Sequence, residues 1–194
     1  GLYNELNKLA KRRFFAQAPH GFFCGGNVTA FQDQMQEYTR QLQKGSIQQA
    51  YKGLLQFMLG LRNELGSAHP EIAVPGSFYA GYMDMSYFSL VPAALKERGL
   101  KIAVVYLHEA SRFEVWLSAA NKKIQARYWE LIARSGWRKY RLVPSTQGYD
   151  SILEDVLAES PDFSDLPALS AQITQGTLAF IADVEAYLAE NAAS

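Results

Sequence analysis

The stretch LKIAVVYLHEASRFEVWLS, residues 100–118, decides the fold class. Residues 100–107 are an almost uninterrupted apolar run, which is typical of a buried strand. Residues 112–118 alternate, with Phe113, Val115 and Leu117 on one face. The intervening HEAS is short enough to be the turn of a hairpin. Because a hairpin joins antiparallel strands, the stretch favours an α+β class over a doubly wound parallel fold.

Apolar residues at helical spacing predict helices on both sides of this hairpin. The predicted helices cover residues 29–44, 46–65, 121–135 and 150–158, with a last helix from residue 164 onward. The first two of these should form a helical hairpin whose apolar stripes face a common core. The predicted strands, besides the central pair, cover residues 77–90, with a bend or bulge at Gly81, and 137–143, before Pro144.

Length and composition are those of a single globular domain. The chain has 194 residues, of which 48% are hydrophobic and 20% charged, and this excludes a disordered chain. We expect residues 29–194 to form one α+β domain, in which helices pack on a central, mostly antiparallel sheet of about four strands. A helical hairpin precedes this sheet and acidic helices end the chain. Residues 1–28 differ in composition, so we expect an appendage that docks on the domain or on a second copy in a homo-oligomer.

Charge is balanced overall but uneven along the chain. Nineteen Lys and Arg residues match nineteen Asp and Glu residues, which gives no global reason to expect nucleic acid as a partner. Residues 150–194 nevertheless hold nine acidic residues and no Lys or Arg, whereas residues 122–141 are rich in basic residues. We therefore expect the acidic C-terminal helices to pack beside the basic centre.

Several classes of protein find no support in the sequence. No apolar run is long enough to cross a bilayer, so we expect no membrane as a partner. The order of residues 1–15 differs from that of a secretory signal, which favours a cytoplasmic protein. Cys24 is the only cysteine, which excludes a disulfide framework within the chain. Dinucleotide, Walker and zinc-hydrolase motifs are absent, so no cofactor is indicated.

One group of aromatic and polar residues suggests a ligand pocket on the sheet. The candidates are Tyr82, Asp84, Tyr87, Arg112, Trp116, Asn121, Gln125 and Trp129. Apolar pockets with a few converging polar groups are the usual form of small-molecule sites, although the edge of a core between sheet and helix has the same composition. Asp84 is the most unusual candidate because it lies inside an apolar run, between Met83 and Met85. Its carboxylate either contacts a ligand or has a structural role, paired with Arg112 or a tyrosine.

Three segments carry a resemblance to a known family. GYMDMSYF (81–88), KIAVVYLHEASRFEVWL (101–117) and the N-K-x-x-Q-x-x-Y-W pattern at 121–129 resemble a family of bacterial proteins with no assigned function. The likeness runs from about Thr29 to the C-terminal helix and implies no activity.

A weaker likeness concerns the order of elements. Helix, three strands, helix and strand is similar to the restriction-endonuclease-like core, which implies a metal site formed by an acid on the second strand and an E-x-K pattern on the third. The matching residues are Asp84 and Glu114, but Trp116 stands where that pattern has lysine. The likeness therefore implies a degenerate site.

The leading hypothesis is a binding domain for a small molecule or a protein, which uses the aromatic and polar pocket. A metal-dependent phosphodiester hydrolase with Asp84 and Glu114 is one alternative, and a structural or assembly protein is another. The residues contain no complete catalytic set, so the sequence leaves open whether the protein is an enzyme.

Overall fold

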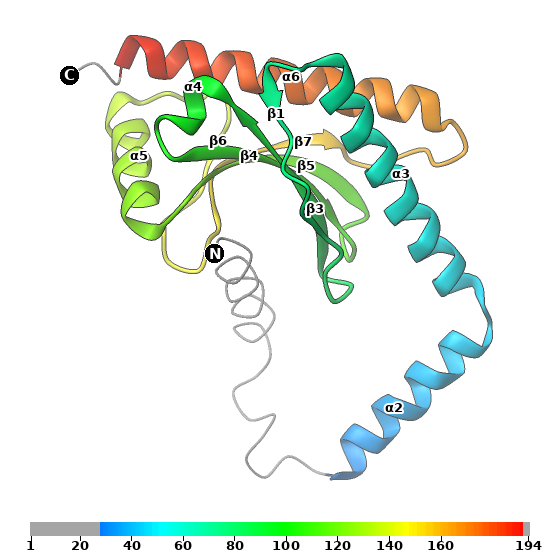
Figure 1. Cartoon of the computed structure of the whole chain (residues 1–194). Coiled ribbons are helices and arrows are strands. Elements are labelled where there is room, and N and C mark those ends of the chain that lie inside the picture. Colours follow the sequence, from blue (N-terminus) through cyan, green and yellow to red (C-terminus); the bar gives the residue numbers. More distant parts are fainter. Residues whose placement is uncertain (1–27, 192–194) are drawn as a thin grey trace.

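Figure 1 shows the computed structural model of the chain, which describes residues 28–191. The predicted appendage up to residue 27 and Cys24 lie outside the described residues. No helix within residues 28–191 combines the length and the apolar composition that a bilayer span requires.

An antiparallel sheet of seven strands forms the centre of the molecule (Figure 1). Its strands are β1 (Ile72–Ala73), β2 (Phe78–Tyr79), β3 (Met85–Pro92), β4 (Leu100–Leu107), β5 (Arg112–Ala119), β6 (Arg141–Leu142) and β7 (Ser151–Ala158). The order across the sheet is β1-β3-β4-β5-β7-β6, and β2 also pairs with β3. The α+β class and the antiparallel sheet are thus confirmed. The expected number of about four strands is wrong for three reasons: the two-residue strand β1 was not predicted, residues 77–90 divide into β2 and β3, and β7 was predicted as a helix.

The hairpin from which the fold class was inferred is present at the predicted place. β4 and β5 pair along their whole length, with Val104 opposite Val115. As predicted, Phe113, Val115 and Leu117 share one face and belong to the main core.

Helices cover that one face of the sheet. The described helices are α2 (Val28–Gln43), α3 (Ser46–Ala68), α4 (Ala93–Lys96), α5 (Lys122–Ser135) and α6 (Leu166–Asn191). α6 runs across the sheet with α3 and α5 beside it (Figure 1). The predicted stripe of α6 is buried throughout, from Leu169 to Leu188. Burial of these side chains against β5 and β7 provides the main hydrophobic stabilisation of the sheet.

The largest difference between the prediction and the structure concerns residues 151–158. They form the strand β7, between β5 and β6, where a helix was predicted. Ile152 and Leu153 are neighbours and both are fully buried, so apolar residues do not alternate here as they do in β5. Both side chains belong to the main core because the register between β5 and β7 shifts between Leu117 and Ser118. This irregularity removes the alternation that would have indicated a strand.

Residues 77–90 form a small hairpin where one long strand was expected. Phe78 of β2 lies opposite Phe88 of β3. Gly81 and Met83 in the connecting turn have positive φ angles of 76° and 65°. Asp84 therefore lies in a turn, and its predicted place inside a strand is wrong.

The two helices α2 and α3 do not form the predicted hairpin over a common core. α3 packs on the domain, but α2 extends away from it (Figure 1). Phe31 and Tyr38, members of the predicted stripe of α2, are 60% and 53% exposed. The amphipathic pattern was interpreted correctly as a helix, but the described domain offers no surface that buries the stripe.

The expected contact between acidic and basic regions is confirmed at α6. Lys139 lies 2.6 Å from the Asp183 carboxylate, and the Tyr140 hydroxyl donates to the same group at 2.6 Å. The C-terminal region contains one helix and not several, since the acidic residues from 150 to 159 lie on or beside β7.

Candidate functional site

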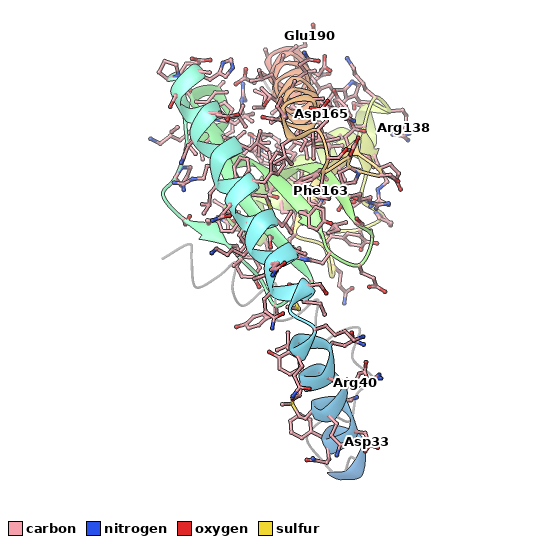
Figure 2. The ribbon with its side chains drawn as sticks, turned by 90° about the vertical axis from the view of Figure 1, so that its right-hand side faces the viewer. Asp33, Arg40, Arg138, Phe163, Asp165 and Glu190 are labelled. Carbon is pink, nitrogen blue, oxygen red and sulfur yellow. The ribbon has the colours of Figure 1, made fainter. Side chains whose placement is uncertain are left out.

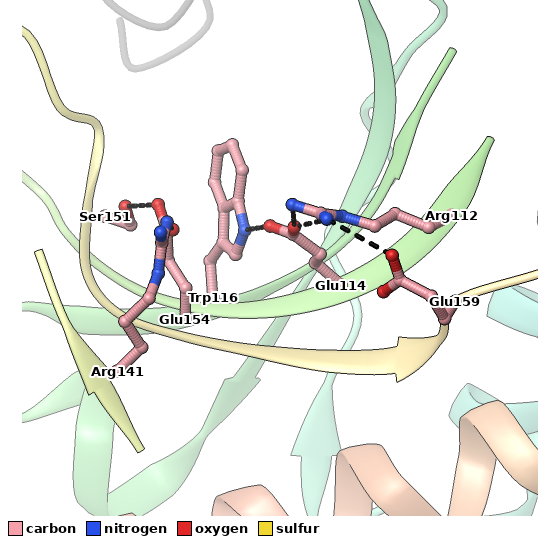
Figure 3. Close-up of polar contacts among 7 residues, drawn as sticks. All are labelled: Arg112, Glu114, Trp116, Arg141, Ser151, Glu154 and Glu159. Atoms are coloured by element: carbon pink, nitrogen blue, oxygen red, sulfur yellow. Dashed lines mark hydrogen bonds and ion pairs between the residues drawn. The ribbon is translucent and has the colours of Figure 1, made fainter. Parts of the chain in front are cut away.

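The second face of the sheet, which we call the helix-free face, carries side chains of strands only among the described residues. Its small apolar cluster consists of Met85, Ala103, Val105 and Trp116, with Tyr79, Tyr87 and Leu107 packed against it. Figure 3 shows that the neighbouring polar side chains project from the sheet on the side opposite the helix beneath it. Of the predicted site residues, this face brings together Tyr87, Arg112 and Trp116.

Glu114 is the centre of the polar contacts on β5. Its side chain is buried, and its two carboxylate oxygens accept hydrogen bonds from Arg112 Nε at 2.7 Å and from Trp116 Nε1 at 2.6 Å (Figure 3). Arg112 also approaches the exposed Glu159 at 3.5 Å. The arginine and indole donors offset the cost of removing this carboxylate from water.

Glu154 forms a second such group on β7. It is 3% exposed, and its carboxylate contacts the guanidinium of Arg141 and the hydroxyl of Ser151 (Figure 3). The hydrogen bond to Glu154 raises the pKa of Arg141 further above its ordinary value. Both carboxylates of the helix-free face are therefore fully engaged in contacts within the sheet.

The positions and contacts of Asp84 and Glu114 are relevant to the alternative of a metal-dependent phosphodiester hydrolase. Asp84 precedes β3 whereas Glu114 lies on β5, and β4 runs between the two strands. Both oxygens of Glu114 already accept hydrogen bonds, so a cation at this carboxylate would compete with the Arg112 and Trp116 donors. Within residues 28–191, no three His, Cys, Asp or Glu side chains are grouped as metal ligands.

The cavity on the helix-free face is small. Tyr87, Trp116, Lys101 and Asp150 are among the side chains that line it, and its volume is about 20 Å³. That volume accommodates about one water molecule. Lys101 is 7% exposed, and burial lowers its pKa to about 8 while the nearby Asp150 opposes the shift.

Three predicted residues on or beside α5 have structural contacts away from this face. Asn121 caps α5 by accepting a hydrogen bond from the Ile124 amide at 3.0 Å. Gln125 is buried and donates to the carbonyl oxygens of Tyr149 and Ser151, both at 2.9 Å. Trp129 donates to the Val143 carbonyl at 2.7 Å. The three side chains hold the segment between β6 and β7 against α5.

The two remaining predicted residues lie in the turn between β2 and β3. Tyr82 is exposed, and its amide donates to Asp84 Oδ1 at 3.0 Å. Asp84 Oδ2 is buried and has no hydrogen-bond partner among the described residues. The eight predicted residues therefore fall into three separate groups rather than one pocket.

A larger pocket lies at the other end of β4, and we call it the α3 pocket. Its volume is about 590 Å³, within the range of small-molecule sites. α3 contributes Ile47, Tyr51, Leu54 and Phe57, which recur at spacings of three and four and so lie on one face of the helix.

The opposite wall of the α3 pocket comes from three other segments. Met83 lies in the β2–β3 turn, and Tyr106 and His108 lie at the end of β4. Phe163 and Leu166 follow β7. Figure 2 places Phe163 beside α3, in agreement with its ring contact with Phe57 at 6.4 Å.

His108 is the polar ring of the α3 pocket, and its hydrogen bonds determine its tautomer. The Ser86 hydroxyl donates its one proton to the Ala80 carbonyl at 2.6 Å. His108 Nε2 lies 2.9 Å from the same hydroxyl oxygen, so this nitrogen carries hydrogen and donates to it. In the neutral ring Nδ1 is then the acceptor, and it has no hydrogen-bond partner among residues 28–191.

The surroundings of His108 favour the neutral form of the ring. Burial lowers its pKa, against the opposing effect of the Asp84 charge. Burial and the same Asp84 charge raise the pKa of Tyr51, whose ring lies 5.7 Å from that of His108. The site thus presents one uncharged acceptor in an aromatic wall.

Sequence reasoning missed most of these residues. His108 was interpreted as part of an exposed turn, and the α3 side chains as core. The sequence does show the apolar helical stripe from Ile47 to Phe57, which could have indicated a binding surface. Nothing in the sequence, however, places this stripe opposite His108. On the helix-free face, Glu154 and its partner Arg141 were missed because β7 was predicted as a helix. Lys101 lies on the correctly predicted β4, and a single lysine in an apolar run carries no signal of its burial.

Comparison with known proteins identifies a family but no activity. No curated protein and no solved structure matches the chain. One family model matches residues 31–188, which span the fold from α2 to α6. The chain belongs to the family described as a domain of unknown function (DUF7000).

Proposed function

We propose that the protein binds a small, mainly apolar molecule in the α3 pocket. The observation that carries this proposal is a pocket of about 590 Å³ walled by aliphatic and aromatic side chains around a single uncharged histidine. Pockets of this size and composition are the default binding sites of folded domains. The pocket replaces the predicted one on the helix-free face, where the cavity is about 20 Å³.

The exposed apolar rim of the pocket supports the proposal. Met83, Phe163 and Leu166 are between 42% and 47% exposed. Apolar side chains that gather at one opening retain surface that a bound molecule would remove from water, and this is a favourable contribution to binding.

The test is ligand-observed NMR, followed by calorimetry, with small aromatic compounds such as p-cresol, indole and toluene. Ala50→Trp places an indole in the pocket from an exposed position of α3, so the core stays intact. Gln56→Trp adds the same ring to the same helix at an exposed position that does not line the pocket. We expect binding to the wild type and to Gln56→Trp, and loss of binding in Ala50→Trp. Failure of all compounds to bind the wild type contradicts the proposal, as does undiminished binding to a folded Ala50→Trp.

A second candidate function is assembly, and the exposed stripe of α2 favours it. Phe31, Met35, Tyr38 and Leu42 form the stripe, and the first three are more than 40% exposed. α2 contacts chiefly α3 among the described elements. An amphipathic helix with an uncovered apolar face is a common contact surface between chains.

The order of residues in α2 suits a second copy of the same chain. In an antiparallel pair centred between Gln36 and Glu37, Phe31 lies opposite Leu42 and Met35 opposite Tyr38. The same register places Asp33 opposite Arg40 of the other copy. A two-fold axis requires a surface that matches itself, and this arrangement of apolar and charged residues does so.

A further inference from the structure

The polar groups of the α3 pocket differ in what they offer a ligand. The Tyr51 hydroxyl donates to the Ala80 carbonyl at 2.8 Å, and the Tyr106 hydroxyl lies 3.2 Å from Ser111 Oγ. Both hydroxyls are thus engaged with the protein. By contrast, Nδ1 of His108 has no hydrogen-bond partner among residues 28–191, which makes it an unpaired acceptor in a residue that lines the pocket.

The pair formed by Ser86 and His108 does not make this pocket a hydrolase site. A nucleophilic serine transfers its proton to a histidine that accepts it. Here the hydroxyl of Ser86 points its proton at the Ala80 carbonyl, and His108 is the donor. Ser86 is also completely buried, so its oxygen is not accessible to a substrate. The role of Ser86 is to hold the imidazole ring in one orientation and one tautomer.

We infer that the ligand is a neutral molecule with an apolar body and one hydrogen-bond donor, a hydroxyl or an N–H group, which His108 Nδ1 accepts. This inference rests on the proposed function of the same pocket and specifies its ligand class. Phenols, indoles and medium-length alcohols belong to the class. A ligand of matching shape without a donor leaves Nδ1 dehydrated and unpaired, which weakens its binding.

Charge in the surroundings separates this class from others. A carboxylate would bring a negative charge toward an acceptor nitrogen and toward Asp84, with no opposing cation among the lining residues. An ammonium group would lose its hydration in a largely apolar pocket, at high cost. A neutral donor meets neither penalty.

The experiment compares p-cresol with 4-methylanisole, which has a similar shape and an ether in place of the hydroxyl. Calorimetry on the wild type is expected to give a dissociation constant roughly 3- to 10-fold smaller for p-cresol, the effect of one net hydrogen bond. His108→Leu removes both ring nitrogens and keeps an apolar side chain in the wall, so no acceptor remains on this side chain. In this variant the two dissociation constants are expected to be equal.

A second variant and two further ligands complete the test. His108→Phe keeps an aromatic ring in the wall, and it too should bind both compounds equally. Equal affinities in the wild type would overturn the inference while the proposed apolar binding remains. Tighter binding of 4-methylbenzylamine or 4-methylbenzoate than of p-cresol would also overturn it. Absence of binding by every one of these compounds would overturn the proposed function as well.

Discussion

Glu114 and Glu159 contact the same arginine, but only Glu114 is removed from water. Glu114 is 3% exposed and bonded to Arg112 and Trp116, whereas Glu159 is exposed and lies 3.5 Å from Arg112. Removal of a buried carboxylate leaves its hydrogen-bond donors unpaired, whereas the charges of an exposed ion pair are screened by solvent.

The pair of glutamates gives a matched test of burial. Glu114→Ala is expected to lower the free energy of unfolding by about 3 kcal/mol, because the buried indole N–H of Trp116 loses this acceptor and the half-buried Arg112 keeps only the exposed Glu159. Glu159→Ala should change it by no more than about 0.5 kcal/mol. Urea unfolding followed by circular dichroism measures both. Equal effects of the two variants would show that Glu114 is not the anchor of this network.

The buried Lys101 leads to a prediction about how the stability of the fold depends on pH. Burial lowers its pKa from 10.5 to about 8, so between these values the unfolded chain binds more protons than the folded chain. Stability therefore rises with pH from 8 to 10.5, by at most about 1.4 kcal/mol per pH unit from this one group. Below pH 8 the lysine is charged in both states, and its contribution no longer changes with pH.

Lys101→Met removes this titration and keeps a side chain of similar length. Urea unfolding at several pH values from 7 to 9.5 should show the wild type gaining stability relative to Lys101→Met above pH 8. The difference between the two proteins should be constant below pH 8. A difference that stays constant over the whole range would mean that Lys101 titrates normally.

At the scale of elements, the β2–β3 turn joins the sheet to the α3 pocket. The Ala80 carbonyl in this turn accepts from both Ser86 and Tyr51. Gly81 permits the turn because its φ is 76° and a Cβ there would lie 1.9 Å from the Met85 carbonyl oxygen. The geometry around His108 therefore depends on a residue that does not line the pocket.

Gly81→Ala is expected to destabilise the fold by more than about 2 kcal/mol, since it adds a backbone clash to the strain of a positive φ. Gly136→Ala is the control. Gly136 has a φ of 71° at the end of α5, but a Cβ there would meet nothing within 4 Å. Its cost should be about 1 kcal/mol, from conformational strain alone. Denaturant unfolding compares the two, and similar losses would argue against the clash.

The elements also show where prediction from sequence works. α5 has its cap at Asn121 and its left-handed glycine at Gly136, and both signals lie within the segment itself. β7 has no such local signal. A glutamate such as Glu154 is typical of an exposed helix position. In β7 it is buried, and its carboxylate contacts Arg141 and Ser151. Such partners come from other parts of the chain, and a local pattern does not contain them.

At the scale of the whole molecule, α2 provides the test of assembly. Light scattering of the full chain should give the mass of a dimer at micromolar concentrations if the stripe pairs as proposed. Met35→Glu places a charge at the centre of the stripe and should give a monomer, because two such charges meet near the two-fold axis. Gln36→Glu changes charge by the same amount at an exposed position outside the stripe and should remain dimeric. A monomeric wild type contradicts the assembly proposal and leaves the α3 pocket unaffected.

Elements whose signals are local could be predicted from the amino-acid sequence. The hairpin at 100–118, the capped helix α5 and the apolar stripe of α6 follow from periodicity and from cap residues within each segment. The sequence also shows the aromatic and acidic candidate residues, but it does not show where their side chains lie in the fold.

Which of those residues contact one another depends on how the elements pack in three dimensions. This packing separates the eight predicted site residues into three groups, and it brings residues from α3, β4 and the segment after β7 together around His108. The physical reason is that periodicity reports which face of an element avoids water, whereas a site depends on which elements pack against that face. The partner is set by pairing and packing between segments far apart in the chain.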